Sequence, residues 1–165
     1  MKKGHRYGES LNRRGFTLLE LLVVIAIIGV LAGVITISFP GATRSARDGR
    51  RRQELQQYRV SLEIYANKSN GVYPDRATVV KPQTMCTGAN PPFGSMTCPQ
   101  DPKDGTATIC GGTCQYRYQS AASGASYVLW AGLEKPVSSG SPCYVICSSG
   151  LSGEAACPTT PTCPW

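Results

Sequence analysis

The chain has 165 residues and a formal net charge of +7. That length gives room for one globular domain with an extension and argues against a second independent core. The charge is concentrated at the front, because residues 1–15 carry +4, from Lys2, Lys3, Arg6, Arg13 and Arg14 against Glu9. The +3 that remains is too small to indicate binding of a specific nucleic acid.

The first predicted elements are a basic leader over residues 1–15 and an apolar helix over residues 16–43. No ionisable side chain lies between Glu20 and Arg44, a run of 23 residues. At about 1.5 Å per residue, such a helix is long enough to cross a hydrocarbon core of about 30 Å. The apolar helix is therefore expected to enter a membrane.

The order of these parts differs from that of an ordinary secretory signal, whose cleavage site follows its apolar core. Here Gly15 precedes the apolar run, so a cut at Gly15 leaves the helix on the mature protein. The string G-F-T-L-L-E-L-L-V-V-I-A-I-I-G, residues 15–29, resembles the start of type IV prepilins and type II secretion pseudopilins. This resemblance implies that a dedicated prepilin peptidase cleaves between Gly15 and Phe16 and methylates Phe16.

The resemblance also gives Glu20 a role, because Glu20 becomes the fifth residue of the processed chain, where the family carries a glutamate. A charged side chain near the bilayer centre costs about 2.5–3.5 kcal/mol, so a lone carboxylate there is expected to be functional and to have a partner. In the family that partner is the amino-terminal amine of a neighbouring subunit, which assigns Glu20 to assembly. The alternatives are a carboxylate that only snorkels to the lipid headgroups and, for the whole segment, a simple bitopic anchor.

An amphipathic helix is predicted over residues 44–70, continuous with the apolar one. A single helix over residues 16–67 would be about 78 Å long, too long for a head of this size to cover, so its apolar half projects. Helical spacing predicts one face packed on a sheet, at Leu55, Tyr58, Leu62 and Tyr65. The charges on the opposite face are expected to be solvated, at Arg47, Arg51, Glu54, Arg59 and Lys68. An alternative for Arg50, Arg51 and Arg52 is binding to lipid headgroups or to acidic groups of adjacent subunits.

A cysteine-rich head is predicted over residues 71–165. The pair Asn70–Gly71 is expected to end the helix by offering a left-handed position. Strands are expected over residues 114–121, 127–134 and 143–148, forming an antiparallel meander on the helix. The pattern leaves open which set of side chains points inward, either Tyr127, Leu129 and Leu133 or the alternate residues Val128 and Trp130.

The eight cysteines favour disulfides formed in an oxidising compartment. Zinc is the competing interpretation, but the close pairs are C-x3-C and the only histidine, His5, lies in the leader. Cys143 and Cys147 would lie about 13 Å apart along a strand, too far for a bond between them. The expected pairs are Cys110 with Cys114 and Cys86 with Cys98, with bonds among the remaining Cys143, Cys147, Cys157 and Cys163.

The sequence offers no catalytic set: it has no P-loop, no H-E-x-x-H and no G-x-G-x-x-G, and its only histidine is in the leader. Asp101 and Asp104 are candidates for calcium binding, but two carboxylates fall short of six to eight oxygen ligands. No enzymatic activity, cofactor or metal is therefore expected.

Together these features predict an α+β fold. A long N-terminal helix projects its apolar half and packs its second half on a small antiparallel sheet, with disulfide-stapled loops. The resemblance implies a structural subunit of a pilus-like filament, first held in the inner membrane and then part of an extracellular or periplasmic polymer. Its partners would be identical subunits, the prepilin peptidase, the inner-membrane assembly machinery and, before assembly, the membrane. The alternatives are a major pseudopilin of a secretion or DNA-uptake system and, in a different class, a monomeric membrane-anchored adhesin or DNA-binding module.

Overall fold

The computed structural model describes residues 15–87, 91–94, 97–105, 110 and 113–165, without the side chains of residues 35–38. The predicted leader lies outside the described residues except for Gly15, and so does His5. The chain divides into two compact units, Met1–Pro40 and Gly41–Trp165. Each unit is described by itself below.

A single long helix, α1, runs over Leu18–Lys68 and contains Pro40. It confirms the expected long N-terminal helix to within two residues at each end. Its end follows the expected chemistry, because Asn70 and Gly71 both have positive φ, 54° and 81°. The Gly71 N–H donates to the carbonyl of Ala66 at 2.8 Å, which satisfies one carbonyl of the last helical turn.

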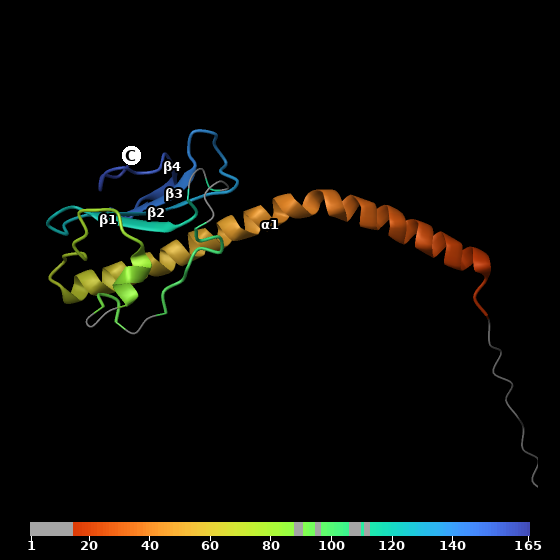
Figure 1. The fold of residues 1–165 in the computed structure, drawn as a ribbon, viewed down its shortest axis with the longest axis horizontal. Coiled ribbons are helices and arrows are strands. Elements are labelled where there is room, and N and C mark those ends of the chain that lie inside the picture. Colours follow the sequence, from red (N-terminus) through yellow and green to blue (C-terminus); the bar gives the residue numbers. More distant parts are fainter. Residues whose placement is uncertain (1–14, 88–90, 95–96, 106–109, 111–112) are drawn as a thin grey trace, which may run out of the picture. The chain divides into compact units, whose positions relative to one another are not determined.

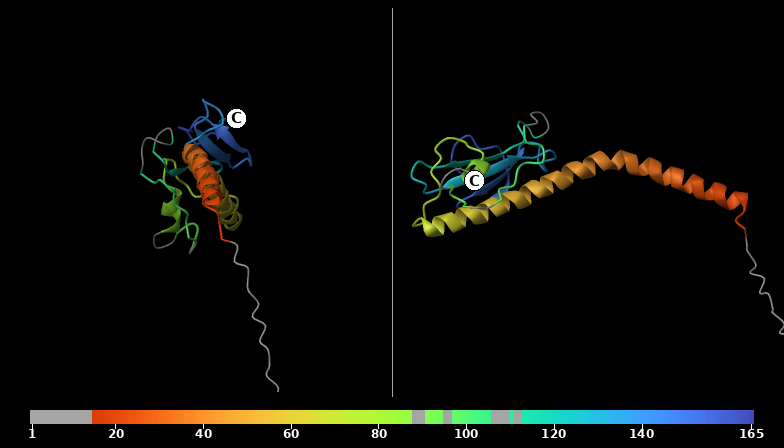
Figure 2. Two further views of the ribbon diagram at one scale, coloured as in Figure 1. Left: turned by 90° about the vertical axis from the view of Figure 1, so that its right-hand side faces the viewer. Right: turned by 60° about the horizontal axis from the view of Figure 1, so that its bottom comes forward.

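The second unit carries an antiparallel sheet in the order β1-β2-β3-β4 along one side of the second half of α1 (Figures 1 and 2). The strands are β1 Tyr116–Ser120, β2 Tyr127–Gly132, β3 Cys143–Cys147 and β4 Ser152–Ala155. The first three fall inside the predicted ranges. The fourth, with the sequence S-G-E-A, was not predicted, because it lacks the β-branched and aromatic residues that mark strands.

The core between sheet and helix contains Leu55, Tyr58 and Leu62 from α1, each fully buried. The sheet contributes the set that includes Tyr127 and Leu129, which answers the question of which face points to α1. The other members of this cluster are Met85, Tyr116, Tyr118, Ala131 and Ile146. The prediction for Tyr65 was wrong, because Tyr65 is only partly buried and its neighbour Ala66 is buried instead.

The tyrosines of this core keep their hydroxyl groups hydrogen-bonded. Tyr118 donates to the carbonyl of Pro74 at 2.8 Å, and Tyr127 donates to Glu63 at 3.3 Å. Tyr116 donates to the carboxylate of Glu54. Burial, with the nearby Glu54 charge, raises the pKa of Tyr116 well above its ordinary value. The aromatic rings therefore fill the core without leaving these three buried hydroxyls unsatisfied.

The opposite face of the sheet has its own apolar cluster, which the carboxyl-terminal tail covers. Val128, Trp130 and Val145 are buried there together with Cys143 and Cys147. Two disulfides hold the tail against this face, Cys143–Cys157 and Cys147–Cys163. The strand β3 is thus bonded to the tail at both of its ends.

The long connection between α1 and the sheet is held by two further disulfides, Cys86–Cys98 and Cys110–Cys114. All eight cysteines are paired, and Cys143 and Cys147 are not paired with each other. A short 3₁₀ helix, η1, spans Pro82–Cys86 and buries Met85 in the core. The α+β architecture with disulfide-stapled loops is confirmed.

Gly132 offers a test of how tightly the head is packed. A Cβ at this position would stand 2.4 Å from the carbonyl oxygen of Cys110, so Gly132→Ala forces a shift in the backbone. Overpacking of this kind costs about 1–3 kcal/mol. We expect Gly132→Ala to lower the thermal unfolding midpoint of the detergent-solubilised chain, measured by the intrinsic fluorescence of Trp130 and Trp165.

Gly140→Ala is the matched control, because no other atom lies within 4 Å of a Cβ at that position. It should leave the midpoint unchanged. Equal midpoints for the two variants would contradict the close approach of Gly132 to Cys110.

Candidate functional site

The predicted cleavage point lies in exposed chain that precedes α1. Gly15 and Phe16 have no regular secondary structure, and the Phe16 side chain is 84% exposed. No atom beyond the neighbouring residues lies within 4 Å of the place where a Cβ on Gly15 would stand. In the structure the Gly15–Phe16 peptide bond is therefore sterically accessible.

Glu20, the predicted assembly residue, is hydrogen-bonded at the start of its own helix. Its Oε2 accepts from the backbone N–H of Thr17 and from the Thr17 hydroxyl, both at 2.8 Å. The Thr17 Oγ1 accepts in turn from the Glu20 N–H at 3.3 Å. This reciprocal arrangement is a capping box, which satisfies free N–H groups at a helix start. Thr17 was not among the predicted site residues, although the T-L-L-E spacing is readable in the sequence.

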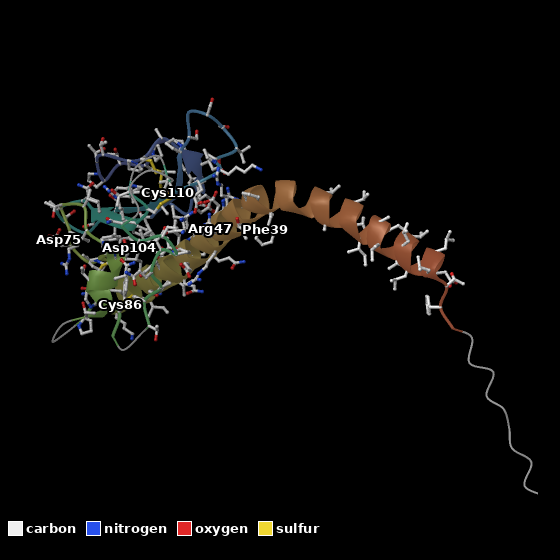
Figure 3. The ribbon with its side chains drawn as sticks, turned by 45° about the vertical axis from the view of Figure 1, so that its right-hand side comes forward. Phe39, Arg47, Asp75, Cys86, Asp104 and Cys110 are labelled. Carbon is white, nitrogen blue, oxygen red and sulfur yellow. A yellow bond between two sulfur atoms is a disulfide. The ribbon has the colours of Figure 1, made fainter. Side chains whose placement is uncertain are left out.

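The helix that follows Glu20 presents apolar side chains to its surroundings (Figure 3). The large apolar residues of Leu18–Val34 are between 47% and 82% exposed. For this comparison α1 is divided into two stretches, Leu18–Val34 and Phe39–Lys68. Among the described residues no single stretch of helix has both the length and the hydropathy of a membrane span, but these two stretches have them when taken together. Exposed apolar surface on this scale marks an interaction with a membrane or with other protein.

The second unit contains a buried cluster of charges centred on Arg51. The guanidinium of Arg51 donates from Nε and Nη2 to the two carboxylate oxygens of Asp101, at 2.8 and 3.0 Å. Its Nη1 donates to Asp48 at 2.7 Å and to Glu134 at 2.9 Å. Arg51 is fully buried and Glu54 is 7% exposed, so the prediction that both are solvated was wrong.

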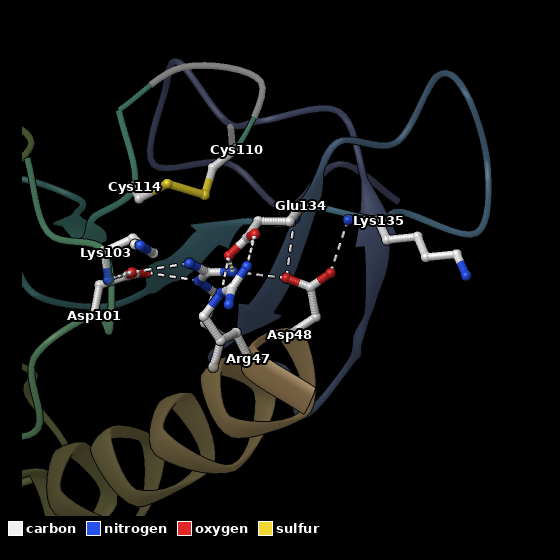
Figure 4. The surroundings of a disulfide bond; sticks show 9 residues. Arg47, Asp48, Asp101, Lys103, Cys110, Cys114, Glu134 and Lys135 are labelled. Carbon is white, nitrogen blue, oxygen red and sulfur yellow. Dashed lines mark hydrogen bonds and ion pairs between the residues drawn. A yellow bond between two sulfur atoms is a disulfide. The ribbon is translucent and has the colours of Figure 1, made fainter. Parts of the chain in front are cut away.

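The other hydrogen bonds of the cluster satisfy the remaining carboxylate oxygens (Figure 4). Arg47 donates to both oxygens of Glu134, at 2.7 and 2.6 Å. Asp48 accepts from the backbone N–H groups of Glu134 and Lys135, at 2.9 and 2.8 Å. Two arginines and three carboxylates thus join α1, the loop at Asp101 and the chain just after β2.

These contacts shift the pKa values of Glu134 and Arg51. Hydrogen bonds from Arg47, aided by Arg51, lower the pKa of Glu134 to about 2, although burial acts in the opposite direction. Burial opposes the charge of Arg51, but the bonds and charges of Asp101, Glu134 and Asp48 outweigh it and raise the pKa of Arg51. Glu134 and Arg51 are therefore both charged at neutral pH.

The two candidate calcium ligands have other partners. Asp101 holds Arg51, and Asp104 accepts from Lys81 Nζ at 3.1 Å and from Gln100 at 2.7 Å. Within the part of the chain that the structure describes, no three His, Cys, Asp or Glu side chains are grouped as metal ligands. Both aspartates therefore serve in ion pairs.

A helix with an exposed apolar half and a small sheet-bearing head together define a pilin-like protein. The prokaryotic N-terminal methylation motif matches residues 10–36. Type II secretion system core protein G of Pectobacterium carotovorum is 34% identical over 104 residues, which cover 58% of this chain and 66% of that relative. The type IV wide pilus major component PilA4 of Thermus thermophilus is 34% identical over 82 residues, covering 50% of this chain and 63% of the relative.

The aligned region thus spans just under two thirds of the length of each relative. No solved structure matches the chain significantly. The motif and the two relatives support the type IV pilin and type II secretion pseudopilin family for this chain.

Adjacent arginines allow the buried cluster to be tested. Arg51→Met removes a fully buried cation and leaves three carboxylates without it, and breaking a buried ion pair in this way costs about 3–5 kcal/mol. We expect urea unfolding of the solubilised chain, followed by the intrinsic fluorescence of Trp130 and Trp165, to show a loss of that size in the free energy of unfolding.

Arg50→Met is the control, because Arg50 is 60% exposed and its one ion pair among the described residues is the i,i+4 pair with Glu54. Its loss should cost clearly less than the loss of Arg51, because the Arg50 guanidinium is hydrated in the folded protein. Similar losses for Arg50→Met and Arg51→Met would show that Arg51 does not organise the head.

Proposed function

We propose that this chain is a structural, non-catalytic subunit of a type IV pilus-like filament, made as a membrane-anchored precursor and polymerised through its N-terminal helix. The observation that carries the proposal is the apolar first half of α1, whose large side chains are at least 47% exposed over Leu18–Val34. Such a surface is unstable in water and is stable in a bilayer or in a bundle of like helices.

The proposed precursor has four parts. Residues 1–15 are a leader that prepilin peptidase removes, and residues 16–43 form the helix that first anchors the chain in the membrane and later lies in the filament core. Residues 44–70 form the amphipathic helix on which the head, residues 71–165, is built. The exposed position of Gly15 and Phe16 supports cleavage between them.

Cleavage changes the chemistry of the helix start. Hydrolysis of the Gly15–Phe16 bond creates a free amine on Phe16, which the peptidase then methylates and which stays protonated. An unpaired ion in an apolar bundle is expensive, and an opposite charge on a neighbour offsets much of that cost. We assign that opposite charge to Glu20, which in the precursor accepts hydrogen bonds from Thr17.

A second candidate is a major pseudopilin of a secretion or DNA-uptake system, since one of the two relatives is named as a secretion core protein and the other as a pilus component. The four disulfides favour the pilus, because crosslinks benefit a small head that works in an exposed filament. Assembly would require the inner-membrane machinery, and the polymer would lie outside the inner membrane.

Processing can be tested directly. The mature protein is expected to begin at Phe16, carrying one added methyl group on its amine. Intact-mass and N-terminal peptide measurements on purified filaments would show both features. Gly15→Leu should leave the precursor uncut in the membrane, whereas a filament subunit that still begins at Met1 would refute the proposed cleavage.

Assembly depends in our proposal on the charge of Glu20, and two variants separate charge from helix capping. Glu20→Gln keeps an oxygen that accepts from Thr17, as glutamine does in capping boxes, but it removes the charge. We expect normal membrane insertion, cleavage and disulfides, with filament number greatly reduced. The measurement is a count of filaments in the native host against total processed subunit.

Glu20→Leu removes both the charge and the cap and should insert readily but assemble no better than Glu20→Gln. If either variant assembles at the wild-type level, pairing between Glu20 and the Phe16 amine is rejected, and the carboxylate only snorkels.

A further inference from the structure

The loop between β2 and β3, residues 133–142, approaches α1 at the end nearest the apolar segment. Its residues Lys135, Pro136 and Val137 form a hollow of about 350 Å³ together with Ser45, Asp48 and Arg52 of α1. Arg52 is one of the arginines for which binding to lipid headgroups was an alternative prediction, whereas no role was predicted for Lys135, Pro136 or Val137.

The backbone of the loop is fixed by carboxylates. Asp48 accepts the N–H of Lys135 at 2.8 Å, and Glu154 of β4 accepts the N–H of Val137 at 2.7 Å. Glu154 also holds Arg52. The acidic groups near the hollow are therefore occupied by donors from within the head.

The side chains of Lys135 and Val137, in contrast, are exposed, whereas Leu133 and Glu134 at the start of the loop are turned inward. Val137 is 86% exposed, more than any other large apolar residue in the part of the chain that the structure describes. Lys135 is also exposed, and among the described residues no carboxylate pairs with its amino group. In Figure 4 the Lys135 side chain extends away from Asp48. An unpaired cation beside an exposed apolar side chain is the chemistry of a membrane-surface contact.

The loop packs on α1 close to the end of the uncharged run. Thr43 is the last residue of the uncharged run and Arg44 is the first charged one, so Ser45 and Asp48 follow within about 8 Å along the helix axis. The headgroup layer on each side of a bilayer is about 5–8 Å thick. When the uncharged run spans the hydrocarbon core, residues packed against Ser45 and Asp48 lie at headgroup depth.

We propose that, in the membrane-anchored precursor, this loop is a contact for anionic phospholipid headgroups. Lys135 pairs with a lipid phosphate at the mouth of the hollow, and Val137 enters the boundary between headgroups and acyl chains. The contact rests on the proposed membrane anchoring. It adds a second attachment to the bilayer, which steadies the head at the membrane surface before the subunit leaves the membrane for the filament.

The test uses the full chain in lipid nanodiscs of phosphatidylcholine, with and without phosphatidylglycerol. A photoreactive benzophenone amino acid replaces Val137 in one variant and Leu151 in a control. Leu151 is also an exposed apolar residue, 47% exposed, but its neighbour Gly150 lies beside Arg59. Arg59 is about 21 Å further along α1 than Ser45, so the control probe lies far from the end of the uncharged run.

Mass spectrometry should find lipid adducts on the probe at position 137 at several-fold higher yield than at position 151. Phosphatidylglycerol should raise the yield at position 137, and Lys135→Gln should return it to the yield in phosphatidylcholine alone. Lys135→Gln should fold normally, since Asp48 binds the backbone of this residue and not its side chain.

Equal yields at the two positions, or adducts at position 137 only with a second copy of the chain, would overturn the lipid contact while leaving the filament proposal intact. Retention of the chain in the discs after a salt wash is recorded separately. A chain that leaves the discs refutes the membrane anchoring on which both proposals rest.

Discussion

The head depends on one buried cation. Arg51 donates to Asp48 on its own helix, to Asp101 in the long connection and to Glu134 just after β2. These partners lie 3, 50 and 83 residues away in sequence, so one guanidinium fixes the position of three separate segments. A buried ion pair is weak evidence of high stability, but its geometry is demanding, and removing one member leaves uncompensated charge. The cluster thereby sets where the sheet sits on α1.

The two halves of α1 meet their surroundings in different ways because their sequences differ. In the second half, leucine and tyrosine at helical spacing bury one side against the sheet, while the arginines and carboxylates satisfy each other. In the first half the apolar residues occur all round, and the large ones of Leu18–Val34 are at least 47% exposed. A helix that is apolar on every side needs an environment that surrounds it.

Much of this architecture could be predicted from the sequence, because its signals are local. The uncharged run, the Asn70–Gly71 stop and the aromatic strand segments each depend on a few neighbouring residues. The errors concern interactions over long distances in sequence. The residues next to Arg51 in sequence do not indicate that Asp101 and Glu134 pair with it. Helical periodicity therefore predicted, wrongly, that Arg51 is solvated. Strand β4 exists because β3 pairs with it, Val145 opposite Gly153, and not because its own residues favour a strand.

The same limit applies to Tyr65 and Ala66. Helical periodicity predicts that the larger residue, Tyr65, faces the sheet. In the structure the smaller residue, Ala66, is the buried one. The capping box at the start of α1 was not predicted, although its signal is local. The spacing of Thr17 and Glu20 indicates such a box, but the predicted role of Glu20 rested on its charge alone.

The carboxyl-terminal tail gives the head a dependence on redox chemistry. Val128, Trp130 and Val145 are sheltered by a segment that two disulfides fasten to β3. Thiols stay reduced where glutathione and thioredoxin act, so these bonds can close only after the head has left such a compartment. Until then the outer face of the sheet lacks its fastened cover. Reduction of these two bonds alone would therefore free the tail from β3 and remove the covalent hold on the cover of Val128, Trp130 and Val145.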